Sequence, residues 1–136
     1  MKEGFVLYSS VDRKLQDLAT KDQRYSVNAY HFVFEALDYT YVANGKNRRR
    51  GAERHLSIAE LANGAITYAI SEFGPLALVV LQEIGLRSMA DIGQAVFNLV
   101  ECRLLNKQAE DRLLDFSLFE DQYARLRSVE VQFKIP

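Results

Sequence analysis

Residues 76–84 form the segment that most restricts the possible folds, because their side chains are apolar on nearly every side. Gly74-Pro75 precedes the segment and Gly85 follows it, and these residue types commonly start and stop helices. A helix that is apolar all round is expected to be buried. We therefore expect a helical protein whose other elements pack around residues 76–84.

Four further segments have the apolar spacing of helices. The chain has 136 residues and only two prolines, which favours long helices. Ser57 and Glu60 have the spacing of a capping box, while Ser88 and either Ser26 or Asn28 are further candidate N-caps. The expected helices are residues 11–19, 28–42, 57–73 and 88–104.

The two ends of the chain carry the pattern of β-strands. Residues 128–135 alternate between apolar and polar side chains, as in a half-buried strand. Residues 4–8 include the other β-prone run and are its expected partner. Since a two-stranded ribbon is marginal alone, we expect it to pack on the helices or to join two chains in a homo-oligomer. Residues 113–126 fit either a loose helix or irregular packing.

The expected fold class is mainly α, with one domain over residues 1–136. Its helical core covers about 11–126 as a compact bundle of about five helices, with a small β element from residues 4–8 and 128–135. A winged-helix-like α+β fold is the alternative. No apolar run approaches about 18 residues, and the N-terminal apolar stretch is short for a signal peptide. We expect a cytoplasmic location and no membrane association.

The net charge of −1 hides an uneven distribution. Residues 1–55 carry 10 basic and 7 acidic side chains, whereas residues 56–136 carry 7 basic and 11 acidic ones. The net positive charge of residues 1–55 comes from the basic loop, residues 46–54, which offers a candidate nucleic-acid site. Residues 77–104 also have the lengths of a helix-turn-helix, but their second helix carries acidic rather than basic side chains. The candidate nucleic-acid-binding residues are Lys46, Arg48, Arg49, Arg50 and Arg54.

Three groups of motifs resemble an uncharacterised family of small bacterial proteins that is known only by a locus-tag name. The first is KDQRYSVNAYHFVFEALDYT at residues 21–40. The second combines RHLSIAEL at 54–61 with FGPLA at 73–77, and the third combines GLRS at 85–88, DIG at 91–93 and VFNLVE at 96–101. The resemblance covers about residues 15–116. It implies no activity and no catalytic residues, and it leaves the terminal segments as additions to the family pattern.

A helical stripe of three polar residues offers weak metal-ligand candidates. His31, Glu35 and Asp38 share one face of the helix over residues 28–42, although an exposed polar stripe gives the same spacing. His55 could act as a base beside a carboxylate, but no nucleophile motif accompanies it. The sequence has no glycine-rich phosphate loop, so we expect no cofactor and assign no catalytic residue.

Two further features indicate contact surfaces. Arg24 and Tyr25 follow Asp22, so Arg24 is expected to pair with Asp22 or with a partner's carboxylate; with His55 they form a candidate ligand or partner surface. Aromatic residues lie all round the helix over residues 28–42, which indicates either core packing or a partly wet boundary, namely a groove or an interface. These aromatic residues are Tyr30, Phe32, Phe34, Tyr39 and Tyr41.

The function expected from these features is a non-catalytic interaction or regulatory module that binds an unidentified protein partner. The alternative is a nucleic-acid-binding protein that uses the basic loop. A small metal-binding protein or an enzyme is the third hypothesis.

Overall fold

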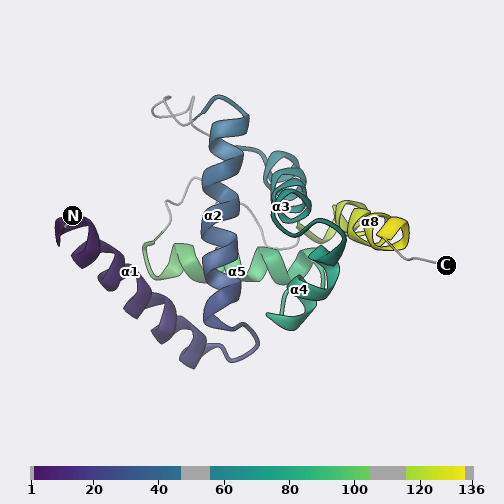
Figure 1. Cartoon of the computed structure of the whole chain (residues 1–136). Coiled ribbons are helices and arrows are strands. Elements are labelled where there is room, and N and C mark those ends of the chain that lie inside the picture. Colours follow the sequence, from purple (N-terminus) through teal and green to yellow (C-terminus); the bar gives the residue numbers. More distant parts are fainter. Residues whose placement is uncertain (1, 47–55, 105–115, 134–136) are drawn as a thin grey trace.

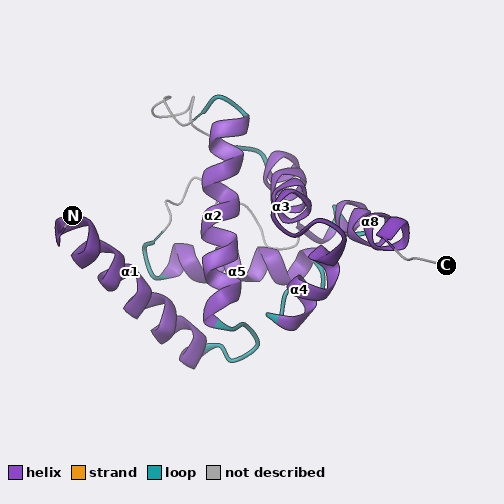
Figure 2. Ribbon diagram, viewed as in Figure 1, coloured by secondary structure: helices purple, strands orange, loops and turns teal. Residues whose placement is uncertain are grey.

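The structure, a computed structural model, describes residues 2–46, 56–104 and 116–133. Within these ranges it is mainly helical and contains no strand (Figures 1 and 2). This confirms the mainly α class. The elements are α1 (Lys2–Lys21), α2 (Val27–Ala43), α3 (Ile58–Phe73), the 3-10 turn η2 (Gly74–Leu76), α4 (Ala77–Glu83), α5 (Met89–Glu101), α7 (Glu120–Tyr123) and α8 (Arg125–Phe133).

The helix starts follow from side-chain caps that the sequence predicts. Ser57 and Glu60 form the complete capping box of α3, with each side chain accepting the other residue's backbone N–H. Ser26 caps α2 and Ser88 caps α5 through the same kind of side-chain acceptor. These three caps satisfy N–H groups that the first turns would otherwise leave without acceptors.

The predicted terminal strands are wrong. Residues 4–8 lie in α1, and residues 128–133 lie in α8; residues 134–136 are outside the described part of the chain. Leu126 is buried, and Val129, three positions later, is half-buried. An interval of three positions between side chains that face the core is typical of a helix, whereas a strand would bury every second side chain. Within the described ranges, a winged-helix-like fold and a ribbon joining two chains lose their structural basis.

The centre of the bundle is α2 rather than residues 76–84. In Figure 1, α5 crosses α2, while α3 lies alongside α2. In α4, Leu78 and Leu81 are buried, but Val79 is 49% exposed and the preceding Leu76 is 54% exposed. The expectation that residues 76–84 are buried on all sides is therefore wrong, because one face of this segment remains at the surface.

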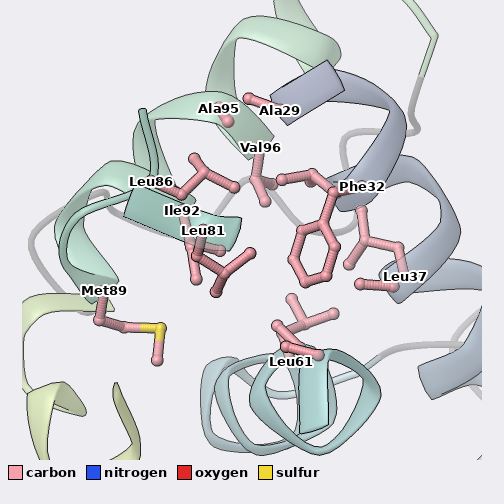
Figure 3. Packing of buried hydrophobic residues seen from close by; sticks show 14 of the residues in the cluster. Ala29, Phe32, Leu37, Leu61, Leu81, Leu86, Met89, Ile92, Ala95 and Val96 are labelled. Carbon is pink, nitrogen blue, oxygen red and sulfur yellow. The ribbon is translucent and has the colours of Figure 1, made fainter. Parts of the chain in front are cut away.

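One hydrophobic core joins the helices. Phe32 and Leu37 of α2 point toward Leu61 of α3, with Ile92 and Val96 of α5 beside them (Figure 3). Each fully buried aliphatic side chain of this kind contributes about 1.5–3 kcal/mol to folding. The core therefore fixes how α2, α3 and α5 lie against one another, and it positions the surface between α2 and α3.

One described stretch, Ile58–Glu83, is long and apolar enough to cross a membrane by length and composition alone. No apolar run of this length is expected from the sequence. Buried core helices pass the same test, and this stretch is interrupted by η2, where Gly74 has a φ of 56° that interrupts α-helical geometry.

Candidate functional site

An open groove of about 580 Å³ lies at the surface between α2 and α3. Its volume falls in the range of sites that hold a small ligand or several side chains of a partner. Aromatic rings and one exposed valine provide most of its apolar lining, and two carboxylates lie among them. We call it the α2/α3 groove; the lining residues are Phe34, Glu35, Asp38, Tyr39, Val42 and Tyr68.

The two helices approach closely beneath the groove because α3 has a glycine at the contact. A Cβ atom added to Gly64 would lie 2.1 Å from Oγ1 of Thr40, so no larger residue fits without movement. Thr40 is completely buried, and its hydroxyl donates a hydrogen bond of 2.7 Å to the carbonyl of Ala36. This bond satisfies the buried hydroxyl of Thr40 within α2, and the missing Cβ of Gly64 lets α3 pack directly against that side chain.

Tyr68 joins the aromatic residues of the two helices. Its ring centroid lies 5.4 Å from that of Tyr39 and 5.6 Å from that of Phe32, with both pairs tilted by 44°. Phe32 is buried and also packs against Phe73, at 6.3 Å between centroids. Phe32 thus supports Tyr68 from the core and Tyr68 packs on Tyr39, while parts of both tyrosine rings line the groove.

The groove is acidic as well as aromatic. The hydroxyl of Tyr68 donates a hydrogen bond of 3.0 Å to the carboxylate of Glu35. Burial, the hydrogen bond to Glu35 and the negative charges of Glu35 and Glu72 together raise the pKa of Tyr68 to about 12. Asp38 adds a second carboxylate one turn along α2, and the described lining residues include no Lys or Arg.

The three metal-ligand candidates do not form a cluster. His31 pairs with Asp12 of α1, at 3.0 Å between Nε2 and Oδ1, whereas Glu35 accepts the hydrogen bond from Tyr68. Asp38 lines the groove. In the described ranges, no three His, Cys, Asp or Glu side chains come together in a way that could hold a metal ion.

Most of the basic loop lies outside the described residues. Lys46 is described, and its Nζ is 4.0 Å from Oε1 of Glu60, so this cation has a carboxylate partner on α3. The other predicted residues of that loop, and the surface candidate His55, are not among those described: Arg48, Arg49, Arg50, Arg54 and His55.

Arg24 and Tyr25 belong to a polar network between the α1–α2 connection and α5. Nε and one Nη of Arg24 lie 2.8 and 2.7 Å from the two carboxylate oxygens of Asp22. The guanidinium carbon also lies 5.2 Å from the ring centroid of Tyr25. Tyr25 is buried, and its hydroxyl donates a hydrogen bond of 2.9 Å to Asp91. The structure thus pairs Arg24 with Asp22, one of the two carboxylates considered from the sequence.

Asn98 extends this network into the core side of α5. Its Nδ2 donates hydrogen bonds of 3.0 Å to Asp22 and to the hydroxyl oxygen of Tyr30. The hydrogen bonds from Arg24 and Asn98 hold the pKa of Asp22 well below its usual range. Burial raises the pKa of Tyr25, and its bond to Asp91 adds to the shift. These groups connect three parts of the chain, and this explains their arrangement without a ligand.

The sequence alone does not predict the α2/α3 groove. Tyr68 and Glu35 are 33 positions apart, and only the packing of α3 on α2 brings them together. The one useful signal was the number of aromatic residues round residues 28–42, which indicated a groove or core packing. The structure places Phe32 in the core and Phe34 and Tyr39 in the groove lining.

Comparisons with protein-family models, curated proteins and solved structures find no match for this chain.

Proposed function

We propose that this chain is a non-catalytic protein-interaction module that binds a segment of a partner protein in the α2/α3 groove. The observation that carries the proposal is an open surface groove lined by Phe34, Tyr39 and Tyr68. Aromatic side chains are enriched in protein interfaces because they bury a large area at a small entropic cost.

Val42 supports an apolar contribution to binding. It lines the groove at the end of α2 and is 55% exposed, so a partner that covers it removes apolar surface from water. The core beneath the groove is packed, with Phe32 behind Tyr68 and Gly64 against Thr40. A preformed groove of this kind binds with little reorganisation of its own backbone.

The test compares two matched arginine substitutions on the purified chain. Val42→Arg places a bulky cation in the groove, whereas Val79→Arg places it at another exposed valine, on α4. The three chains are first used to capture proteins from a bacterial lysate. We select a protein that the wild-type chain and Val79→Arg retain but Val42→Arg does not. This protein is then purified and titrated against all three chains. The proposal requires that the purified partner binds the wild-type chain and Val79→Arg directly and binds Val42→Arg more weakly. Equal affinity for all three chains contradicts the proposal.

Nucleic-acid binding through the basic loop is the second proposal. The sequence favours it because Lys46 and four arginines lie within nine residues, accompanied by one acidic residue. Replacement of Arg48, Arg49 and Arg50 by Ala is expected to abolish retention on immobilised DNA in low salt. Retention that is unchanged by the triple substitution, or absent from the wild type, contradicts this proposal.

A cytoplasmic location and self-association also remain proposals. Localisation of the full chain carrying a small tag, compared with a cytoplasmic marker in fractionated bacteria, tests the first. Light scattering across a range of protein concentrations tests the second: a constant monomer mass contradicts self-association.

A further inference from the structure

We infer that the occupant of the α2/α3 groove is an arginine-bearing segment of the partner protein, with a guanidinium group placed between the groove carboxylates and the tyrosine rings. This inference rests on the proposed function and deepens it by naming the chemistry of the partner.

The carboxylates select a positively charged occupant. Glu35 and Asp38 lie one helical turn apart on α2, and both line the groove. Glu72 adds a further negative charge near Tyr68. An entirely apolar partner would cover these carboxylates without replacing their hydration, which is unfavourable. A partner cation replaces that hydration with ion pairs, and the described lining of the groove supplies no Lys or Arg of its own.

The aromatic rings favour arginine over lysine. Tyr39 and Tyr68 pack against each other with their centroids 5.4 Å apart, and both line the groove beside the carboxylates. A planar guanidinium can stack on a tyrosine face while its N–H groups bond to a carboxylate, whereas a lysine ammonium is more strongly hydrated and has no plane to stack. One arginine can therefore use both features of the groove.

The same chain shows this arrangement at another place. Arg24 makes two hydrogen bonds to the carboxylate of Asp22 while its guanidinium lies 5.2 Å from the centroid of the Tyr25 ring. A carboxylate and a tyrosine ring thus contact the same guanidinium group. In the α2/α3 groove the carboxylates and tyrosines are present, but among the described lining residues there is no guanidinium. We assign that position to the partner.

The test uses a defined probe, a short capped peptide of alternating leucine and arginine, and a matched peptide with citrulline in place of each arginine. Citrulline has nearly the same shape as arginine but no charge. Titration into the isotopically labelled full chain is followed by NMR. We expect the arginine peptide to shift the ring signals of Tyr39 and Tyr68. Its affinity for the chain should exceed that of the citrulline peptide by a factor of at least about two to five.

Substitutions separate the groove from the rest of the acidic surface. Asp38→Asn is expected to weaken binding of the arginine peptide by about two- to fivefold, while leaving binding of the citrulline peptide unchanged. Glu101→Gln removes an exposed carboxylate at the end of α5 and serves as the matched control. Tyr39→Leu keeps the groove apolar but removes one aromatic ring. It is expected to weaken binding of the arginine peptide more than binding of the citrulline peptide.

Failure of this inference is distinguishable from failure of the proposed function. Equal binding of the two peptides, or an equal effect of Asp38→Asn and Glu101→Gln, overturns the arginine inference. If a partner protein still binds the wild type and not Val42→Arg, the groove remains an interaction site with a different occupant. If no partner distinguishes Val42→Arg from Val79→Arg, the proposed function itself fails.

Discussion

Tyr68 of α3 donates a hydrogen bond of 3.0 Å to the carboxylate of Glu35 on α2. This bond orients a half-buried phenol, whose ring packs on Tyr39, beside an exposed carboxylate. It therefore combines the aromatic and the acidic character of the α2/α3 groove in one pair of residues. Binding of a cationic partner in this groove depends on the two features together.

Tyr68 is expected to lose its proton near pH 12, since burial and the charges of Glu35 and Glu72 disfavour the phenolate. Because this pKa is raised on folding, its stabilising contribution is complete below about pH 10, the ordinary pKa of tyrosine, and declines as pH rises toward 12. NMR of ring-labelled tyrosine measures the titration directly.

Glu35→Gln removes the nearest negative charge and is expected to lower the pKa of Tyr68 toward its ordinary value of 10. Glu101→Gln, on α5, is the control and is expected to leave the Tyr68 titration unchanged. Identical titration of Tyr68 in the Glu35→Gln variant and the wild type would show that the hydrogen bond between α2 and α3 does not form.

Gly64→Ala is expected to destabilise the chain by about 1–3 kcal/mol, because the added methyl group overpacks the contact with Thr40. Chemical denaturation measures the loss. Ser71→Ala, at an exposed position of the same helix, is expected to change the free energy of unfolding by less than about 0.5 kcal/mol.

A second substitution tests the cause of this loss. Thr40→Ala removes the two atoms nearest to the added methyl group, Oγ1 and Cγ2. The Gly64→Ala substitution should therefore cost less free energy in the Thr40→Ala background than in the wild type, and a double-mutant cycle measures the difference. Simple additivity of the two substitutions would contradict direct contact between α2 and α3 at this point.

The sequence predicts most of the helices but not how they pack. The capping residues Ser57, Glu60 and Ser88 act within a few positions of their partners, so their effect can be read locally. The contacts of Gly64 with Thr40 and of Tyr68 with Glu35 link two different helices, and no local pattern predicts them. Aromatic residues along α2 indicated a groove or core packing, and the structure divides them between the two.

The error at the chain ends has a related cause. Alternation over residues 128–135 is a local pattern, and it predicted a strand without considering the residues before it. Leu126 and Val129 fall on one helical face, and the backbone of residues 125–133 is helical in the structure. Tertiary packing of that face outweighs the strand preference of individual valines.

Secondary chemical shifts of the full chain test the structure of this end. Residues 125–133 are expected to show helical carbon shifts, and residues 2–21 are expected to show the same pattern for α1. Shifts of the α5 residues in the same spectrum provide an internal reference. A run of β-type shifts over residues 128–133 would restore the strand and contradict α8.

Asp22→Asn is expected to destabilise the chain by about 1 kcal/mol at neutral pH, a modest value because the Arg24 side chain is 62% exposed and its pairing is screened by water. Hydrogen bonds from Arg24 and Asn98 lower the pKa of Asp22 in the folded chain. The stabilisation is therefore complete above about pH 4 and is lost as pH falls through the lowered pKa. Denaturation at several pH values measures this.

Asp17→Asn replaces an exposed carboxylate on α1, the helix that precedes Asp22, and is the matched control. It is expected to leave stability nearly unchanged across the same pH range. The difference in free energy of unfolding between the wild type and Asp22→Asn is expected to shrink as the pH falls. A difference that grows with acidity would contradict the hydrogen bonds assigned to Asp22.

The most direct measurement of the central claim is a set of intermolecular nuclear Overhauser effects between the full chain and the arginine peptide. We predict contacts from the δ-methylene protons of the peptide arginine to the ring protons of both Tyr39 and Tyr68. The citrulline peptide at the same concentration should give weaker contacts at these rings. Binding of the arginine peptide with contacts to other surfaces, and none to these two rings, would contradict a cation-binding groove between α2 and α3.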